Sequence, residues 1–276
     1  MQPLAIVTDS TSDMPDELIA QHHIQVVPNY VVIDGESAED GKGMTREAFY
    51  TKLPTMISFP TTATASSGTY QQLYNRLLQE GFKQILSIHA SSLLSGIFNA
   101  ASVAAQPFSK QIHVIDSQYV TLGLGFQVLA AAELALTDPL DNILTVIENV
   151  RQRIRVVALL DTLEYVRRSG RVSWARARIG DFLHIKPLVE IRAGRILSLG
   201  QVRTRRNGIE RLVDMLRNLG NLERLAILHT NAKEEAQRIL DSQDLTLSTN
   251  PFCVNVTPVI GAHTGPNALG FAAVVR

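Results

Sequence analysis

The first 135 residues alternate short apolar runs with segments of helical character. The apolar runs have the length of buried strands, and the segments after them carry apolar residues at helical spacing behind polar capping residues. We expect strands over 4–10, 82–90 and 111–117 and helices over 12–23, 66–81, 91–105 and 120–136. Because successive parallel strands are joined by right-handed helical crossovers, this alternation predicts a mainly parallel sheet with flanking helices.

After residue 155 the pattern changes to one typical of antiparallel pairing. Two short helices broken at Gly170 are expected over 162–183, and a hairpin over 185–205 turns at Ala193-Gly194. Further apolar runs lie at 156–161, 224–230, 251–260 and 269–276, and amphipathic helices at 207–220 and 232–243. The chain is therefore predicted to be α/β with two domains, an N-terminal α/β domain at 1–155 and a C-terminal α+β domain with a mixed sheet at 156–276.

Composition narrows the functional classes. The 276 residues are 45% apolar and 19% charged, and the 26 basic and 26 acidic residues cancel, which argues against nucleic acid as a partner. Cys253 is the single cysteine, so no internal disulfide or cysteine metal cluster can form, which favours a reducing cytoplasm. The start lacks the pattern of a signal peptide, and the longest apolar run, 120–136, is too short for a membrane span. We expect a cytoplasmic protein without stable membrane insertion.

Two polar stretches join expected strands to expected helices. The stretch 59–70 is rich in hydroxyl side chains and precedes a helix start, where free N–H groups attract anions. The stretch 89–98 places the Ser95 hydroxyl beside Gly96, where a ligand could approach the backbone. In both stretches the serines, Ser66 included, could instead simply cap a helix.

A third stretch, VIGAHTGPNALG at 259–270, combines a titratable ring with glycines that allow tight turns. His263 beside Thr264 forms a donor pair, although a lone histidine is more often a structural residue. Arginines cluster around Gly170 and after the hairpin. Because the net charge of the chain is zero, a solvent-exposed face is the expected place for these arginines, and one guanidinium could still reach an anion site.

Common enzyme motifs are missing from the sequence. There is no G-x-x-x-x-G-K-[ST] loop, and Gly123 and Gly125 lack the third glycine of a dinucleotide fingerprint. Ser95 does not stand in a G-x-S-x-G elbow, and nothing in the spacing supports a triad of Ser95, His263 and Asp9.

Six segments resemble signature motifs of the DegV family of bacterial fatty-acid-binding proteins. They are VTDSTSDMP (7–15), SSLLSG (91–96), VIDS (114–117), RRSGRVS (167–173), IKPLVEI (185–191) and VIGAHTGPNALG (259–270), of which the last is the most specific. Ile97 stands where the family usually has threonine. The resemblance runs along the whole chain and implies a DegV-like fold and a protein that performs no chemistry itself.

The resemblance implies a site for the carboxylate of a long-chain fatty acid. Thr62, Ser95 and His263 match the family's head-group residues, and Arg203 matches an arginine near the site. The expected set is completed by Ser66, Gly96 and Thr264. The stretch 62–66 reads T-A-T-A-S where the family usually has T-S-Q-P-S, which leaves Thr62 and Thr64 both open as the loop threonine.

The family's role implies a carrier that encloses palmitate, stearate or oleate in a tunnel between its two domains. The carboxylate would be presented to a separate fatty acid kinase, which converts it to an acyl phosphate. The bound fatty acid is the implied ligand, without a cofactor or metal. The helix at 120–136 could line the tunnel, since Gly123 and Gly125 leave room beside larger side chains.

Two alternatives belong to other functional classes. The first is a serine-dependent lipid ester hydrolase that uses Ser95 and His263. The second is an interaction module whose arginines around Gly170 dock an acidic partner.

Overall fold

The computed structural model describes residues 4–108, 110–172, 185–242, 247 and 249–276. The chain forms two compact units. The first comprises Met1–Tyr30 and Ala63–Arg153, and the second comprises Val31–Thr62 and Ile154–Arg276.

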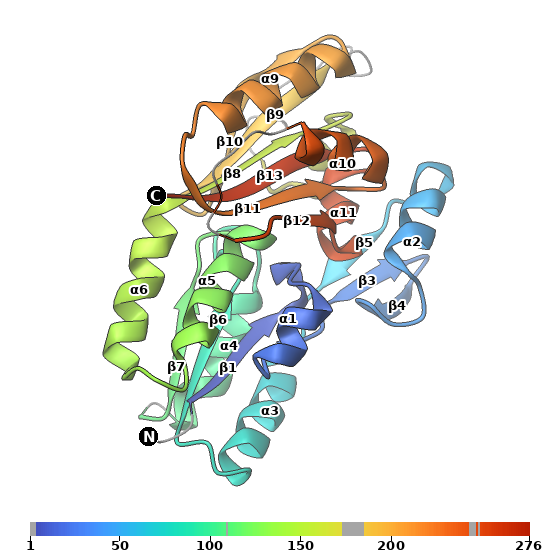
Figure 1. Ribbon diagram of the computed structural model, residues 1–276. Helices are drawn as coiled ribbons and strands as arrows, with labels where there is room; N and C mark the ends of the chain where they lie inside the picture. The colour runs from blue at the N-terminus through green and yellow to red at the C-terminus, as the bar shows by residue number, and fades with distance from the viewer. Residues whose placement is uncertain (1–3, 109, 173–184, 243–246, 248) are drawn as a thin grey trace. The chain divides into compact units, whose positions relative to one another are not determined.

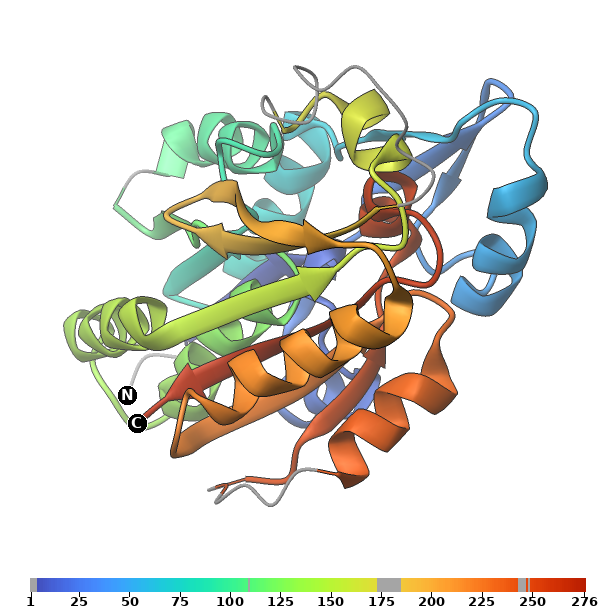
Figure 2. The same ribbon diagram turned by 90° about the horizontal axis from the view of Figure 1, so that it is seen from above.

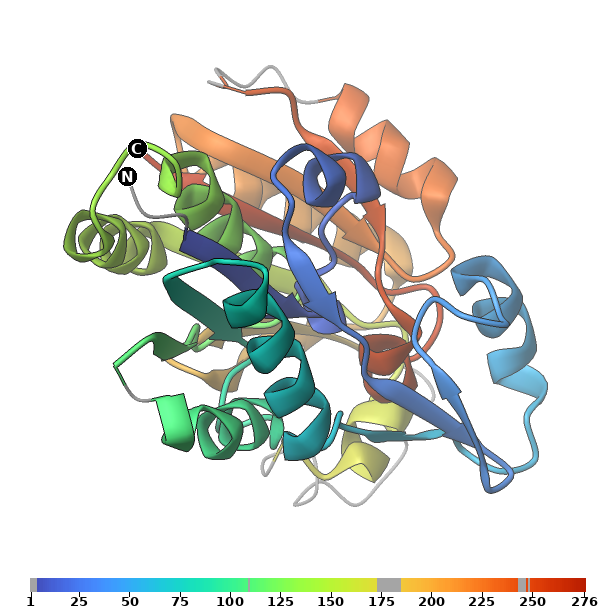
Figure 3. The same ribbon diagram turned by 90° about the horizontal axis from the view of Figure 1, so that it is seen from below.

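The first unit is built on a four-stranded parallel sheet in the order β2-β1-β6-β7 (Figure 1). Its strands are β1 (Leu4–Asp9), β2 (Gln25–Val27), β6 (Gln84–His89) and β7 (Ile112–Asp116). Its helices are α1 (Asp16–Gln21), α3 (Ser67–Gln79), α4 (Ile97–Ala105), α5 (Leu122–Leu134) and α6 (Leu140–Arg153), with 3₁₀ turns η1 (Ser10–Ser12) and η3 (Gln106–Phe108). Helices α3 and α4 cover one face of the sheet, and α5 and α6 cover the other (Figure 3). The predicted parallel sheet with flanking helices is confirmed.

Helix α5 forms the core of the first unit, and 11 of its 13 residues are buried. A Cβ atom on Gly125 would lie 2.6 Å from the carbonyl oxygen of Ser12 and 3.1 Å from Met14 Cγ, so this glycine lets the turn η1 approach the helix. The room that the sequence analysis expected beside Gly125 is therefore filled by side chains and backbone of the first unit itself.

The second unit contains a six-stranded mixed sheet in the order β10-β9-β8-β13-β11-β12. Among its described strands, only β11 and β12 are parallel neighbours, and the other paired strands are antiparallel. Its strands are β8 (Ile154–Leu159), β9 (Lys186–Arg192), β10 (Arg195–Val202), β11 (Leu222–His229), β12 (Phe252–Asn255) and β13 (Leu269–Val275). Its helices are α2 (Arg46–Lys52), α7 (Glu164–Ser169), α9 (Arg205–Arg217), α10 (Lys233–Asp241) and α11 (Pro258–Thr264), with the 3₁₀ turn η2 (Leu53–Thr55). The predicted mixed sheet is confirmed.

Helices α9 and α10 lie on one face of this sheet (Figure 2). Apolar residues of both helices, such as Leu212 and Ile239, pack with Ile227 and Phe271 of the strands in one buried cluster. A small third sheet has the order β4-β3-β5, formed by β3 (Tyr30–Ile33), β4 (Glu36–Glu39) and β5 (Thr61–Ala63).

Residues 31–62 belong to the second unit, whereas the sequence analysis placed them in a domain of residues 1–155. Helix α2 in this segment packs Tyr50 into a buried cluster with Val259. The Tyr50 hydroxyl also donates to the carbonyl oxygen of Val256 at 2.8 Å, across 206 positions of sequence. A local pattern cannot reveal such a contact. The boundary predicted after residue 155 falls two residues earlier, after Arg153.

The predicted turns of the second unit are confirmed where the structure describes them. β9 and β10 form the expected hairpin, and Ala193 and Gly194 at its tip have φ angles of 49° and 75°. Helix α7 ends at Gly170, whose φ of 73° is the left-handed conformation common after helices. The second helix expected beyond this glycine falls mostly on residues 173–184, which lie outside the described residues.

Candidate functional site

Thr62 and His263 form a hydrogen bond within the second unit. The Thr62 Oγ1 atom lies 2.9 Å from His263 Nε2, although the residues are 201 positions apart. Thr62 is the middle residue of β5, His263 lies in the last turn of α11, and the contact is partly buried. Thr264, the next residue, donates its hydroxyl to a carbonyl oxygen one turn earlier at 3.3 Å. The structure thus brings together two of the residues that the sequence analysis selected.

Helix α11 forms where the sequence analysis expected strand and glycine-rich turns. Thr257 caps its start through a side-chain hydrogen bond, and Pro258 fits its first turn. Gly265 follows with a φ of 81°, which ends the helix. Gly261 serves close packing rather than a turn, because a Cβ atom there would lie 2.2 Å from the Tyr50 hydroxyl. These contacts fix the ring of His263 against β5.

His263 is uncharged at neutral pH. Burial, together with the positive charge of Arg171, lowers the pKa of His263 to about 4. A neutral imidazole carries one N–H donor and one lone pair. If Nε2 carries the hydrogen, it donates to Thr62 and leaves the threonine O–H free to donate to another acceptor. The pair can therefore offer a hydrogen-bond donor to an anion.

Aromatic and cationic side chains lie on neighbouring elements of the second unit. The ring of Phe59, just before β5, lies 5.2 Å from the ring of Tyr165 on α7. The guanidinium of Arg168 stacks over the Phe59 ring at 3.7 Å and pairs with Glu164 at 2.9 Å. Helix α7 contacts α11, which carries His263. Arg167 and Arg168 are exposed, as the sequence analysis expected for a solvated face, and the helix that carries them packs against the element of His263.

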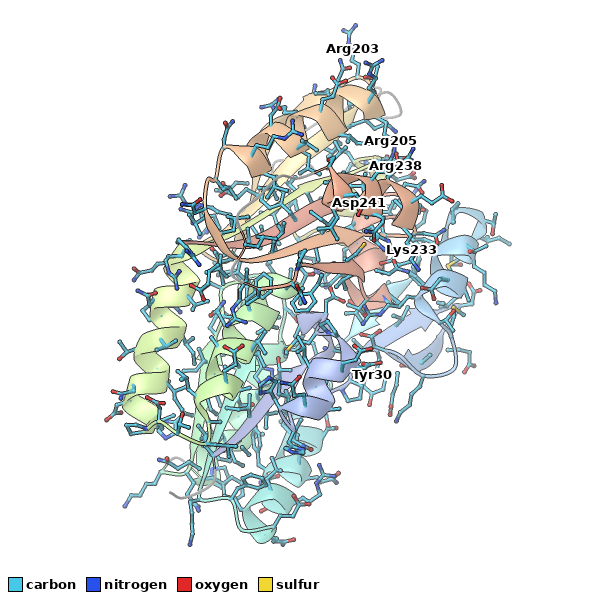
Figure 4. All side chains as sticks on the ribbon, in the orientation of Figure 1. Tyr30, Arg203, Arg205, Lys233, Arg238 and Asp241 are labelled. Carbon is cyan, nitrogen blue, oxygen red and sulfur yellow. The ribbon has the colours of Figure 1, made fainter. Side chains whose placement is uncertain are left out.

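Arg203 and Arg205 have different surroundings. Arg203 is exposed between β10 and α9, and Figure 4 shows it at the outer end of that helix. Arg205 is partly buried. It pairs with Glu235 at 2.6 Å and Asp161 at 3.3 Å and donates to the carbonyl oxygen of Asn267 at 2.6 Å. Arg205 is therefore the arginine of this pair that is bonded to the carboxyl-terminal motif, which the spacing of charges alone could not show.

Ser66, Ser95 and Gly96 lie in the first unit. Ser66 is exposed and accepts a hydrogen bond from the Thr69 backbone N–H at 3.1 Å, which is the capping arrangement considered for it. Ser95 is half-buried, and its Oγ accepts from the Ile97 N–H at 3.3 Å. Gly96 precedes α4, and a Cβ atom built there would meet no described atom within 4 Å. A ligand could therefore approach the backbone at Gly96.

A buried chain of polar side chains in the first unit was missed by the sequence analysis. His89 Nδ1 lies 3.0 Å from Asp9 Oδ2, and His89 Nε2 lies 2.7 Å from Ser87 Oγ. The order resembles a hydrolase triad, but all three side chains are fully buried, so Ser87 is closed to substrates. Positions 87 and 89 share one face of a strand, and this alternation is the signal that could have revealed the pair.

The hydrolase alternative finds no support in these arrangements. The Nε2 atom of His263 is hydrogen-bonded to Thr62, and the carboxylate of Asp9 is hydrogen-bonded to His89. Neither residue is therefore arranged to activate a serine nucleophile in the way a triad requires.

The described residues contain neither a helix suited to crossing a membrane nor a side-chain cluster suited to a metal ion. No described helix has both the length and the apolar character to cross a membrane. Within the same part of the chain, no three His, Cys, Asp or Glu side chains are grouped so that they could hold a metal ion.

Comparison with known proteins gives consistent matches along the chain. A family model described as "Uncharacterised protein, DegV family" matches residues 3–276. A DegV domain-containing protein of Listeria innocua is 32% identical over 281 residues, covering 100% of this chain and 99% of the relative. Protein DegV of Bacillus subtilis is 32% identical, covering 97% of each.

Solved structures match equally completely. A DegV family protein from Thermus thermophilus, described by its fatty acid binding, has a TM-score of 0.90 at 30% identity and covers 99% of this chain and 100% of its own. DegV from Bacillus subtilis, described as a fatty acid binding protein, has a TM-score of 0.86 at 29% identity over 100% of both chains. The chain belongs to the DegV family.

Proposed function

We propose that the protein binds a long-chain fatty acid and holds its carboxylate at the Thr62–His263 pair. The observation that carries the proposal is the 2.9 Å contact between these two side chains. It joins the loop threonine and the terminal-motif histidine that the family resemblance selects. Support also comes from two relatives of about equal length, 30% and 29% identical, that are described as fatty-acid-binding.

The chemistry of the pair suits a carboxylate. A buried carboxylate is costly unless it receives hydrogen bonds, and bonds to a charged acceptor are the stronger kind. The Thr62 hydroxyl can donate such a bond. The positive charge of Arg171, in the same unit, contributes to the lowered pKa of His263. Ser95, on the first unit, is proposed as a further donor on the strength of the SSLLSG motif. Gly96, Ser66, Thr264 and Arg203 complete the proposed set.

The acyl chain supplies most of the binding energy in this proposal. Burial of a saturated chain contributes about 0.8 kcal/mol per CH₂ group, so palmitate, stearate and oleate are all suitable ligands. The tunnel between two domains that the sequence analysis expects for this chain stays a prediction.

In the proposed role the protein is a carrier and catalyses no reaction. It would present the carboxylate to a separate fatty acid kinase, which phosphorylates one carboxylate oxygen to form an acyl phosphate. The proposal predicts that the kinase acts on the bound fatty acid and that the carrier alone leaves it unchanged.

Extraction of the purified protein with organic solvent, followed by mass spectrometry, tests the proposal. We expect a long-chain fatty acid in near-equimolar amount after expression in a lipid-replete host. Thr62→Ala and His263→Ala should each weaken rebinding to delipidated protein. Thr64→Ala separates the two candidates of this stretch, because rebinding should stay unchanged in this variant if Thr62 is the loop threonine. Absence of fatty acid from the extract, together with no binding by the delipidated protein, would refute the proposed function.

A further inference from the structure

Asp9 is a fully buried carboxylate that receives five hydrogen bonds. Its Oδ1 accepts from the Thr11 N–H at 3.0 Å, the Thr11 hydroxyl at 2.5 Å and the Asn29 amide at 3.3 Å. Its Oδ2 accepts from His89 Nδ1 at 3.0 Å and the Ala90 N–H at 3.2 Å. Burial by itself would raise the pKa of Asp9, but the bonds from His89, Thr11 and Ala90 outweigh it and lower the pKa below its ordinary value. Asp9 is therefore ionised.

His89 continues the hydrogen bonding from Asp9 to Ser87 and Tyr74, and the donors and acceptors in this chain can be assigned in one order that satisfies every hydrogen. Tyr74 Oη lies 2.8 Å from Ser87 Oγ, which lies 2.7 Å from His89 Nε2. If Tyr74 donates to Ser87 and Ser87 donates to His89 Nε2, then His89 Nδ1 donates to Asp9 and each hydrogen has an acceptor. The reversed direction would require a charged imidazole and a further acceptor for the Tyr74 hydrogen. The hydrogen bonds thus form a continuous buried chain from Tyr74 to Asp9.

Asp9 is the common acceptor of loops at the carboxyl edge of the parallel sheet. Ala90, which donates to it, begins the segment 90–96 that follows β6, here called the serine loop. The other backbone donor lies in η1, after β1. Within the serine loop, the Ser95 N–H donates to the Ser91 carbonyl oxygen at 3.0 Å. Ser95 is thus linked to Ala90 through Ser91, the next residue, at the sheet edge where parallel α/β sheets bind ligands. Tyr119 and Asp116 accept further hydrogen bonds of the loop, from Ser91 and Ser92.

We infer that Asp9 is a positioning residue whose carboxylate fixes the start of the serine loop and thereby holds Ser95 in place for the fatty acid carboxylate. Asp9 is fully buried, so it acts through the loop and does not touch the ligand. This inference rests on the proposed function, because that function supplies the ligand of Ser95.

Asp9→Asn is the direct test, because asparagine keeps the shape but has one acceptor oxygen. Its NH₂ group would face either the donors of His89 and Ala90 or those of Thr11 and Asn29, so one set loses its acceptor. We expect faster amide hydrogen exchange across the serine loop and a fatty acid affinity lower by about tenfold. Asp214→Asn, exposed on α9 of the second unit, is the matched control and should change neither measurement.

A double-mutant cycle separates positioning from general destabilisation. Ser95→Ala should weaken fatty acid binding, and Asp9→Asn should have no further effect on affinity in the Ser95→Ala protein. An equal loss of affinity in both backgrounds would overturn the inference, because Asp9 would then act without Ser95. Unchanged exchange in the serine loop of Asp9→Asn would overturn it as well.

A second pair of variants serves if Asp9→Asn fails to fold. His89→Asn keeps an N–H donor near the position of Nδ1, whereas His89→Leu removes it. We expect the serine loop to stay protected in the first variant and to exchange faster in the second, and equal exchange in both would contradict the role of Asp9. If the wild type binds no fatty acid, the proposed function is refuted, and with it the effect of Asp9 on affinity. The exchange data would still decide whether Asp9 fixes the serine loop.

Discussion

Replacing His263 with glutamine should flatten the pH dependence of stability between pH 4 and pH 6.5. The pKa of His263 is about 4 in the folded protein, against an ordinary value of 6.5. Between these values the unfolded chain binds more protons at this residue than the folded chain, so the free energy of unfolding rises with pH. The contribution is fully present above pH 6.5 and is lost as the pH falls towards 4. The difference between these two pKa values corresponds to about 3 kcal/mol.

Urea titrations of delipidated wild-type and His263→Gln protein, at a series of pH values across this window, measure the effect. Glutamine can keep a hydrogen bond to Thr62 but does not titrate. His229, whose pKa burial also lowers to about 4, is present in both proteins, so its contribution cancels in the difference. Equal pH slopes for the two proteins, or an imidazole of His263 that titrates near 6.5 by NMR, would refute the reasoning.

Two further predictions concern packing and ion pairs in the described structure. Gly261→Ala should lower the free energy of unfolding by about 1–3 kcal/mol, because the new methyl group would meet a buried tyrosine hydroxyl. Gly96→Ala, which faces open space, should change it by less than about 0.5 kcal/mol, and equal urea midpoints for both variants would contradict the packing argument. Arg205→Ala should destabilise by about 2 kcal/mol, because the partly buried Glu235 carboxylate loses the guanidinium bonded to it, whereas Asp161 keeps Lys186 at 2.7 Å. Arg203→Ala, the control, should leave the thermal unfolding midpoint nearly unchanged. An equally small change in Arg205→Ala would contradict the prediction, because it would mean that solvent screens the ion pairs of Arg205.

Local patterns predicted most elements of the first unit and the hairpin of the second. The apolar runs at 4–10, 82–90 and 111–117 correspond to β1, β6 and β7. The helix α11 was missed because its apolar residues continue the preceding strand pattern and its glycines are also common in turns. The pair Thr257-Pro258 is a typical helix start and is the local signal that could have identified it.

The candidate site was only partly accessible from the sequence. Thr62 and His263 could be selected by their motifs, but their hydrogen bond depends on how α11 packs against α2 and α7. Asp9 stood in a quoted motif, yet its role as a common acceptor depends on strand order in the sheet. Both arrangements join residues that are far apart in the chain.

The sequence by itself determined the order and type of most elements, the two sheet classes and the family, because these follow from short-range periodicity and contiguous motifs. Only the tertiary structure decided that residues 31–62 belong to the second unit, that Thr62 meets His263 and that Asp9 accepts hydrogen bonds from several loops of the first unit. These features depend on which distant segments pack against each other, and the periodicity of one segment does not specify its partner.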